Sequence, residues 1–169
     1  MVITTDVILK GKEWQLAKEK LSHIFKKWPH YMLFYLSLSI GILYDQRISE
    51  PDDNGEEPIA VPRTVLHNNA SATLDYFFQA AILTSDTVPF TENERLELAF
   101  ADESKIVLDK MRFLTEFANY GITVLVQCIG ESELESMDNI KNFLASTIEG
   151  TNLDIFEITE DMFDEEDLD

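Results

Sequence analysis

With 169 residues, of which 45% are hydrophobic, the chain is long enough to bury one sizeable core. Its formal net charge of −19 disfavours direct binding to nucleic acid or to an anionic membrane surface. A single cysteine, Cys128, excludes an intramolecular disulfide and fits a reducing compartment. We therefore expect a cytoplasmic protein with one helical domain over residues 1–150 and an acidic C-terminal tail over 151–169.

Two helices are predicted near the start of the chain. Residues 12–28 carry an apolar stripe at helical spacing with lysines largely between its members, and we expect Pro29 to end this helix. The stripe consists of Trp14, Ala17, Leu21, Ile24, Phe25 and Trp28. Residues 30–47 are apolar nearly all round, which is typical of a helix enclosed by others. Their continuous apolar stretch, residues 31–44, is shorter than the ~20 residues of a membrane-spanning helix.

A long exposed loop is predicted over about residues 48–69. The stretch from Arg47 to Asn69 contains three prolines, one glycine and five acids, and turn residues of this kind interrupt helices. Its one apolar patch is Ile59 to Val61, with Val65 and Leu66 nearby.

Three further helices follow from periodicity and capping signals. Residues 69–86 present one apolar face, made of Leu74, Phe77, Phe78, Ala81 and Ile82. Thr91 with Glu94, and Ser132 with Glu135, have the spacing of a capping box, so we expect helices to begin just after Thr91 and Ser132. The apolar stripe expected for the last helix is Leu134, Met137, Ile140, Leu144 and Ile148.

Residues 121–130 fit two secondary structures. The run from Ile122 to Val126 is β-branched except at Leu125 and favours a strand. In that case an α+β fold would pair segments 2–9, 122–129 and 152–158. Alternatively, one long helix through Gly121 would carry a seam of Val107, Met111, Leu114, Phe117, Leu125 and Cys128. We favour the helix, and thus a mainly α bundle of five to six helices.

The sequence contains no catalytic, cofactor-binding or metal-binding motif. The three histidines lack zinc-site spacing, and Gly-rich phosphate loops and G-x-S-x-G are absent. The first choice for a small-ligand site is the cluster Arg63, His67, Asn68 and Asn69 beside the long loop, although the two asparagines equally fit a turn and N-cap. We thus expect no catalytic residue, cofactor or metal, and an enzyme using this cluster and the 48–69 loop is the weakest of the alternatives.

The tail combines strong charge with regularly spaced apolar residues. Residues 151–169 hold nine acids and no base, so the segment should repel itself and stay disordered when free. Its partner-binding residues are predicted to be Ile155, Phe156, Ile158, Met162 and Phe163, which a helix would gather along one side. The alternative is a solubilising tail whose first half, through Ile158, docks on its own domain.

These features favour a non-enzymatic, protein-binding accessory or regulatory subunit. Its expected partner is a protein with a basic surface or an apolar groove, which the acidic tail would approach. A second hypothesis is an acidic protein that mimics nucleic acid and blocks the channel of a DNA- or RNA-binding protein, although six lysines within residues 1–30 weaken a uniformly negative surface.

Overall fold

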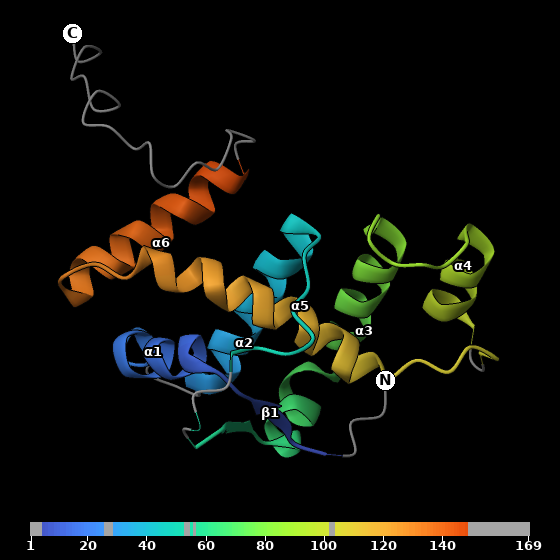
Figure 1. The fold of residues 1–169 in the computed structure, drawn as a ribbon, viewed down its shortest axis with the longest axis horizontal. Coiled ribbons are helices and arrows are strands. Elements are labelled where there is room, and N and C mark those ends of the chain that lie inside the picture. The colour runs from blue at the N-terminus through green and yellow to red at the C-terminus, as the bar shows by residue number, and fades with distance from the viewer. Residues whose placement is uncertain (1–4, 26–28, 53–54, 56, 102–103, 149–169) are drawn as a thin grey trace, which may run out of the picture.

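The computed structural model describes residues 5–25, 29–52, 55, 57–101 and 104–148. In this part of the chain six α-helices, one short 3₁₀ helix and a two-stranded sheet follow one another. Figure 1 shows α3 and α4 side by side at one end of the molecule and α6 at the other. The elements are β1 (Val7–Leu9), α1 (Lys12–Leu21), α2 (Pro29–Tyr44), β2 (Ile59–Val61), α3 (Arg63–Thr84), α4 (Glu92–Phe100), α5 (Lys110–Leu125), η1 (Val126–Cys128) and α6 (Glu133–Ile148). The prediction of a mainly α bundle is confirmed.

Helices α2 and α5 form the centre of the bundle, and small residues let them approach very closely. A Cβ atom added to Gly41 of α2 would lie 1.9 Å from the carbonyl oxygen of Phe117, and one added to Gly121 of α5 would lie 1.7 Å from that of Ser37. Backbone thus meets backbone at this crossing. The glycine that weakens an isolated helix is required here by packing.

The core surrounds this crossing and includes contributions from every helix. Its largest fully buried side chains include Trp14, Phe34, Phe78, Phe117 and Phe143. The Nε1 atom of Trp14 donates to Oδ1 of Asn119 at 3.0 Å, and Nδ2 of Asn119 donates to the carbonyl oxygen of Ile48 at 3.0 Å. These bonds satisfy buried polar atoms and connect α1, α5 and the segment after α2.

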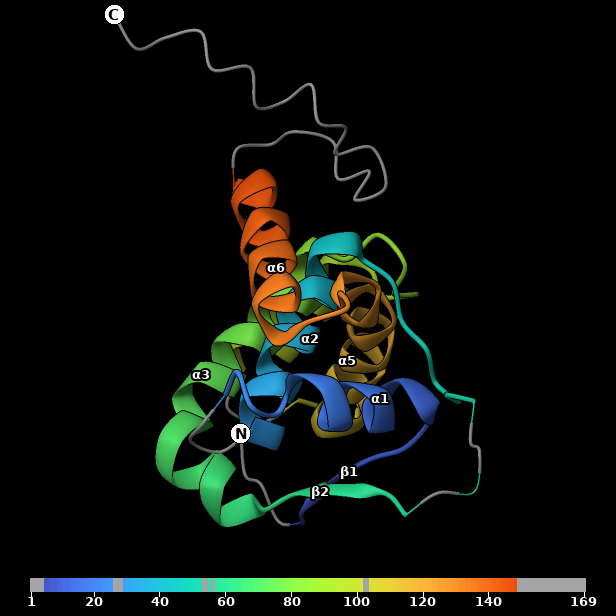
Figure 2. The same cartoon turned by 90° about the vertical axis from the view of Figure 1, so that its left-hand side faces the viewer.

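The sheet corrects the predicted loop over 48–69. Strands β1 and β2 are antiparallel, with Val7 opposite Val61 and Leu9 opposite Ile59, and these four side chains are buried. Figure 2 shows the two strands side by side near α1. The apolar patch in the loop is therefore a strand, and α3 already begins at Arg63.

Several helix boundaries also differ from expectation. Helix α1 ends at Leu21, and Pro29 is the first residue of α2 because proline is well suited to the first helical turn, where its missing N–H is not needed. The strand alternative for 122–129 is wrong, since α5 and η1 cover Ile122 to Cys128. Val107 is fully exposed ahead of α5, whereas Leu114, Phe117, Leu125 and Cys128 of the predicted seam are buried. Segment 152–158 lies outside the described residues.

Both predicted capping positions begin a helix. At α4, the hydroxyl of Thr91 accepts from the Glu94 amide at 3.4 Å, and the Glu94 carboxylate accepts from the Thr91 amide at 2.8 Å. At α6, the Ser132 hydroxyl accepts from the Glu135 amide at 3.1 Å, but the Glu135 carboxylate accepts from the amide of Glu131. The second cap is thus only half of a capping box.

Asp45 ends α2 with a positive φ of 49° and connects α2 to the turn after α3. Its carboxylate accepts from the amides of Asp86 at 2.8 Å and Thr87 at 3.2 Å. Burial favours the protonated acid, but these bonds and those from the Ser85 and Thr87 hydroxyls outweigh it and lower the pKa of Asp45. The ionised carboxylate is therefore part of the folded structure at neutral pH.

Candidate functional site

An apolar groove lies between α2 and α6, with a volume of about 340 Å³. Ile24 and Phe25, which follow α1, are among its lining residues. The helices contribute Met32, Tyr35 and Leu36 from α2 and Met137, Ile140 and Leu144 from α6. Three of these side chains are substantially exposed, Met137 by 46%, Met32 by 41% and Leu144 by 37%. This contiguous, partly exposed apolar surface makes the groove a candidate interaction site.

The groove exists because α6 packs with a narrow face. Its buried residues are Ser136, Ile140 and Phe143. The predicted stripe of Leu134, Met137, Ile140 and Leu144 is therefore mostly on the outside, with Leu134 65% exposed. The side chain of Ile148 lies outside the described residues.

Hydrogen bonds at the start of α6 fix which face turns inward. The Ser136 hydroxyl donates to the Ser132 carbonyl at 2.9 Å and accepts from the Gly130 amide at 3.0 Å. The Asn139 side chain donates to the carbonyl of Cys128 at 3.3 Å. These bonds hold the face with Ser136 and Asn139 toward η1, so the methionine and leucines of the neighbouring face remain open.

The floor of the groove is uncharged. Burial raises the pKa of Tyr35 above its ordinary value, and the neighbouring Tyr31 adds to the effect, so the phenol stays neutral. The ring of Tyr35 lies 4.7 Å from that of Tyr31 and 5.5 Å from that of Phe77, measured between centroids. The Ser39 hydroxyl donates to the Tyr35 carbonyl at 2.9 Å, within the helix. The groove therefore suits apolar groups.

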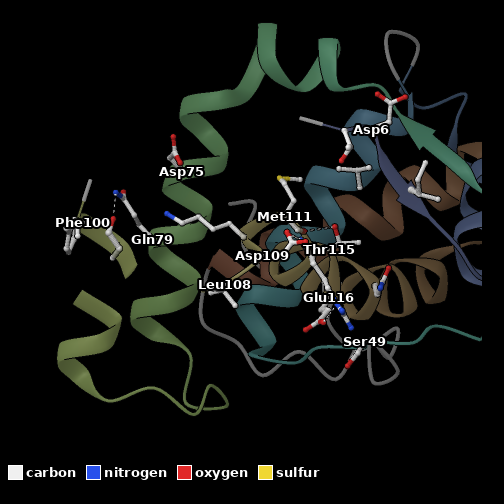
Figure 3. Close-up of a pocket in the computed structure, with 18 residues that line it drawn as sticks. Asp6, Ser49, Asp75, Gln79, Phe100, Leu108, Asp109, Met111, Thr115 and Glu116 are labelled. Carbon is white, nitrogen blue, oxygen red and sulfur yellow. Dashed lines mark hydrogen bonds and ion pairs between the residues drawn. The ribbon is translucent and has the colours of Figure 1, made fainter. Parts of the chain in front are cut away.

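A second and larger cleft, of about 970 Å³, opens between α3, α4, α5 and β1. Figure 3 shows Asp75 and Gln79 of α3 on one side and Met111, Thr115 and Glu116 of α5 on the other. Its lining mixes four acids, two bases, several amides and hydroxyls, and apolar residues.

Many polar groups in this cleft are already engaged by the fold. The Asp109 carboxylate accepts from the Arg112 amide at 3.0 Å and caps α5. Gln79 donates to the carbonyl of Ala99 at 3.1 Å, which connects α3 to α4. The ammonium of Lys110 lies 4.5 Å from the centroid of the Phe78 ring.

Two acids at the cleft are similarly engaged. The Asp6 carboxylate accepts from the Arg63 amide at 2.9 Å, at the start of α3. The Glu116 carboxylate lies 3.4 Å from Arg112 and 3.8 Å from Arg47. The polar groups of the cleft thus mainly connect elements of the fold. The cleft is therefore a weaker candidate for a binding site than the apolar groove.

The predicted ligand cluster lies in the first two turns of α3. Arg63 and His67 are one helical turn apart and exposed, and neither lines the groove or the cleft. Asn68 and Asn69 are within the helix, so they do not form its N-cap, a position that Pro62 occupies. Their side chains lie outside the described residues. A ligand at this cluster stays a prediction.

The predicted tail residues also lie outside the described part of the chain. They are Ile155, Phe156, Ile158, Met162 and Phe163. The groove, in contrast, was missed by sequence reasoning, because the stripe on α6 has the spacing of a core face. A usable signal was the excess of apolar residues: α6 carries Phe143 in addition to the predicted stripe, more than one narrow helix face can bury.

Cys128 and the potential metal ligands do not add a second candidate site in the described part of the chain. Cys128 is buried, and burial raises its pKa to about 11, which keeps the thiol protonated and unreactive. Within the described ranges, no three His, Cys, Asp or Glu side chains come together as a metal site. Among those same residues, no helix has the length and apolar character needed to cross a membrane.

The chain was compared with protein-family models, with curated proteins and with solved structures. None of them matches it.

Proposed function

We propose that this chain is a non-enzymatic accessory or regulatory subunit that binds another protein in the cytoplasm. The observation that supports the proposal is the open apolar groove between α2 and α6, with Met32, Met137 and Leu144 at its surface. Large apolar side chains gain free energy when a partner covers them, about 1.5–3 kcal/mol for each one fully buried. Methionine adapts its shape to irregular partners, which suits a binding surface.

The groove and the tail contribute in different ways. The groove takes up an apolar ridge of the partner, as when an amphipathic helix lies between two helices. The acids of residues 151–169 attract basic groups on the partner and accelerate association, while Ile155, Phe156, Ile158, Met162 and Phe163 enter an apolar groove there. The apolar contacts then provide most of the affinity, and the acidic charge of the tail raises the association rate.

Affinity capture with matched variants tests this proposal. The full chain is immobilised as wild type, as Met137→Glu and as Val107→Glu, and proteins retained from the native lysate are quantified with and without nuclease. Val107→Glu introduces the same charge at a fully exposed apolar position outside the groove. We expect a partner that wild type and Val107→Glu retain equally and that Met137→Glu binds roughly thirtyfold more weakly, the equivalent of about 2 kcal/mol.

Two outcomes would contradict the proposal. Equal retention by all three proteins would remove the groove from recognition. Capture of a DNA- or RNA-binding protein that wild type and Met137→Glu retain equally would favour mimicry of nucleic acid instead. A third protein, in which the acids of 160–169 are replaced by their amides, should associate more slowly and lose the salt dependence of binding.

A further inference from the structure

Helix α6 buries far fewer side chains than the central helix of the same length. Both α5 and α6 have 16 residues, and nine residues of α5 are buried. Among the side chains of α6 that the structure describes, those of residues 133–147, three are buried: Ser136, Ile140 and Phe143. Two large apolar side chains therefore provide most of the burial that docks α6 onto the bundle.

The contacts of α6 lie in the part of the helix that comes first in the chain. No described side chain beyond Phe143 is buried, and Figure 2 shows the C-terminal end of α6 projecting beyond the other helices. The hydrogen bonds of Ser136 and Asn139 join α6 to the residues just before it. The Glu133 carboxylate lies 3.7 Å from His23, but this acid is 76% exposed, and exposed ion pairs add little stability.

The segment between η1 and α6 allows the helix to move as a unit. Residues 129–132 belong to neither helix, and they include Gly130, whose residue type has the greatest backbone freedom. A few residues of this kind are enough to serve as a hinge. The close crossing of α2 and α5 is formed without α6, so the centre of the bundle keeps its contacts when α6 moves.

We infer that α6 detaches from the bundle in a local opening that leaves α1 to α5 folded, so that the apolar groove exists only while α6 is docked. Each opening removes the groove wall made of Met137, Ile140 and Leu144. A molecule that covers these residues binds only the docked form and thereby holds α6 in place. This coupling to a partner rests on the function proposed above, whereas the opening itself needs no partner.

Amide hydrogen exchange of the full chain measures the opening in the absence of any partner. A helix of 16 residues is only marginally stable alone in water, so a detached α6 unwinds and its amides exchange. The amides of residues 117–122, at the crossing of α2 and α5, exchange only when the whole bundle unfolds. Relative to intrinsic rates, we expect residues 140–144 to exchange roughly a hundredfold faster than residues 117–122. Their exchange should also depend less on urea, because the opening exposes less surface than global unfolding does.

Gly121→Ala separates the opening from global unfolding. The variant weakens the crossing of α2 and α5, which is present in the docked and the open form alike. It should accelerate exchange at residues 117–122 roughly thirtyfold and leave residues 140–144 unchanged. Equal acceleration of both segments would overturn the inference. If this variant does not fold, the wild type decides by itself, because equal rates and equal urea dependence in the two segments would also overturn it.

Asn139→Ala distinguishes detachment of α6 from fraying within the helix. It removes the hydrogen bond from α6 to the Cys128 carbonyl. The matched control is Asn142→Ala, which changes an exposed asparagine of the same helix. Exchange at residues 140–144 should be about five- to tenfold faster in Asn139→Ala than in Asn142→Ala. Equal exchange in these two variants would overturn the inference. All of these measurements use the isolated protein, so failure of this inference and failure to find a partner are observed separately.

Discussion

The close crossing of α2 and α5 predicts that Gly121→Ala destabilises the protein, opposite to its effect on an isolated helix. The added Cβ would lie 1.7 Å from the carbonyl oxygen of Ser37, whereas ordinary contact begins at 3.4 Å. The oxygen belongs to the backbone, so no side-chain rotation relieves the clash and the two helices must move apart by about 1.7 Å, the difference of these distances.

The magnitude follows from two opposing effects. Alanine favours a helix over glycine by about 1 kcal/mol, while overpacking in a core costs typically 1–3 kcal/mol and occasionally more. Because the clash is with backbone, the upper part of that range applies, and we expect a net loss of about 2 kcal/mol. In a chain of this size, this corresponds to a melting temperature lower by about 4–8 °C.

Urea denaturation followed by far-ultraviolet circular dichroism measures this loss. Gly130→Ala is the milder comparison, since a Cβ there meets the side chain of Glu135, which can rotate away at the loss of its hydrogen bond from the Glu131 amide, without any movement of helices. Gly41→Ala should resemble Gly121→Ala, because its Cβ would lie 1.9 Å from the carbonyl oxygen of Phe117. If Gly121→Ala were as stable as the wild type or more so, the close approach of the two helices would be wrong.

Three further changes test other parts of the structure. Trp14→Phe removes the donor to Asn119 and should lower the free energy of unfolding by about 1–3 kcal/mol in urea, and a loss below about 0.5 kcal/mol would contradict a buried hydrogen bond. The pKa of Asp45 is lowered from 3.8 by folding, so its ionised form stabilises the protein above pH 3.8 and this contribution is lost as the pH falls through the lowered value. Asp45→Asn, which tolerates the same positive φ, should be about 1 kcal/mol less stable at pH 7, and the gap should close in acid; a gap independent of pH would refute the assignment. Cys128 should resist a thiol reagent at pH 8 and react after denaturation, whereas rapid reaction of the native protein would show an exposed thiol.

Local signals in the sequence were sufficient for some of the architecture. Thr91 and Glu94 begin α4 as predicted, because a capping box uses only neighbouring atoms. The uniformly apolar segment became the central helix α2, and residues 74–82 presented the expected face. In these cases the spacing of apolar residues, or a hydrogen bond between near neighbours in the chain, decides the structure. Both can be predicted directly from the sequence.

Features that depend on distant residues were not predictable in this way. The β-branched run after Gly121 favours a strand locally, but the contact of Gly121 with Ser37 on α2 requires a helix. Ile59 to Val61 gain their strand partner from Val7 to Leu9, far away in the sequence.

The apolar groove is the clearest case of a feature that only the tertiary structure decided. The sequence determined that α6 is an amphipathic helix with more apolar residues than one narrow face can bury. Which of them turn inward was decided by Ser136 and Asn139, through their hydrogen bonds to Gly130 and Cys128. Because those bonds direct Ile140 and Phe143 into the core, Met137 and Leu144 are left at the surface, where they line the groove.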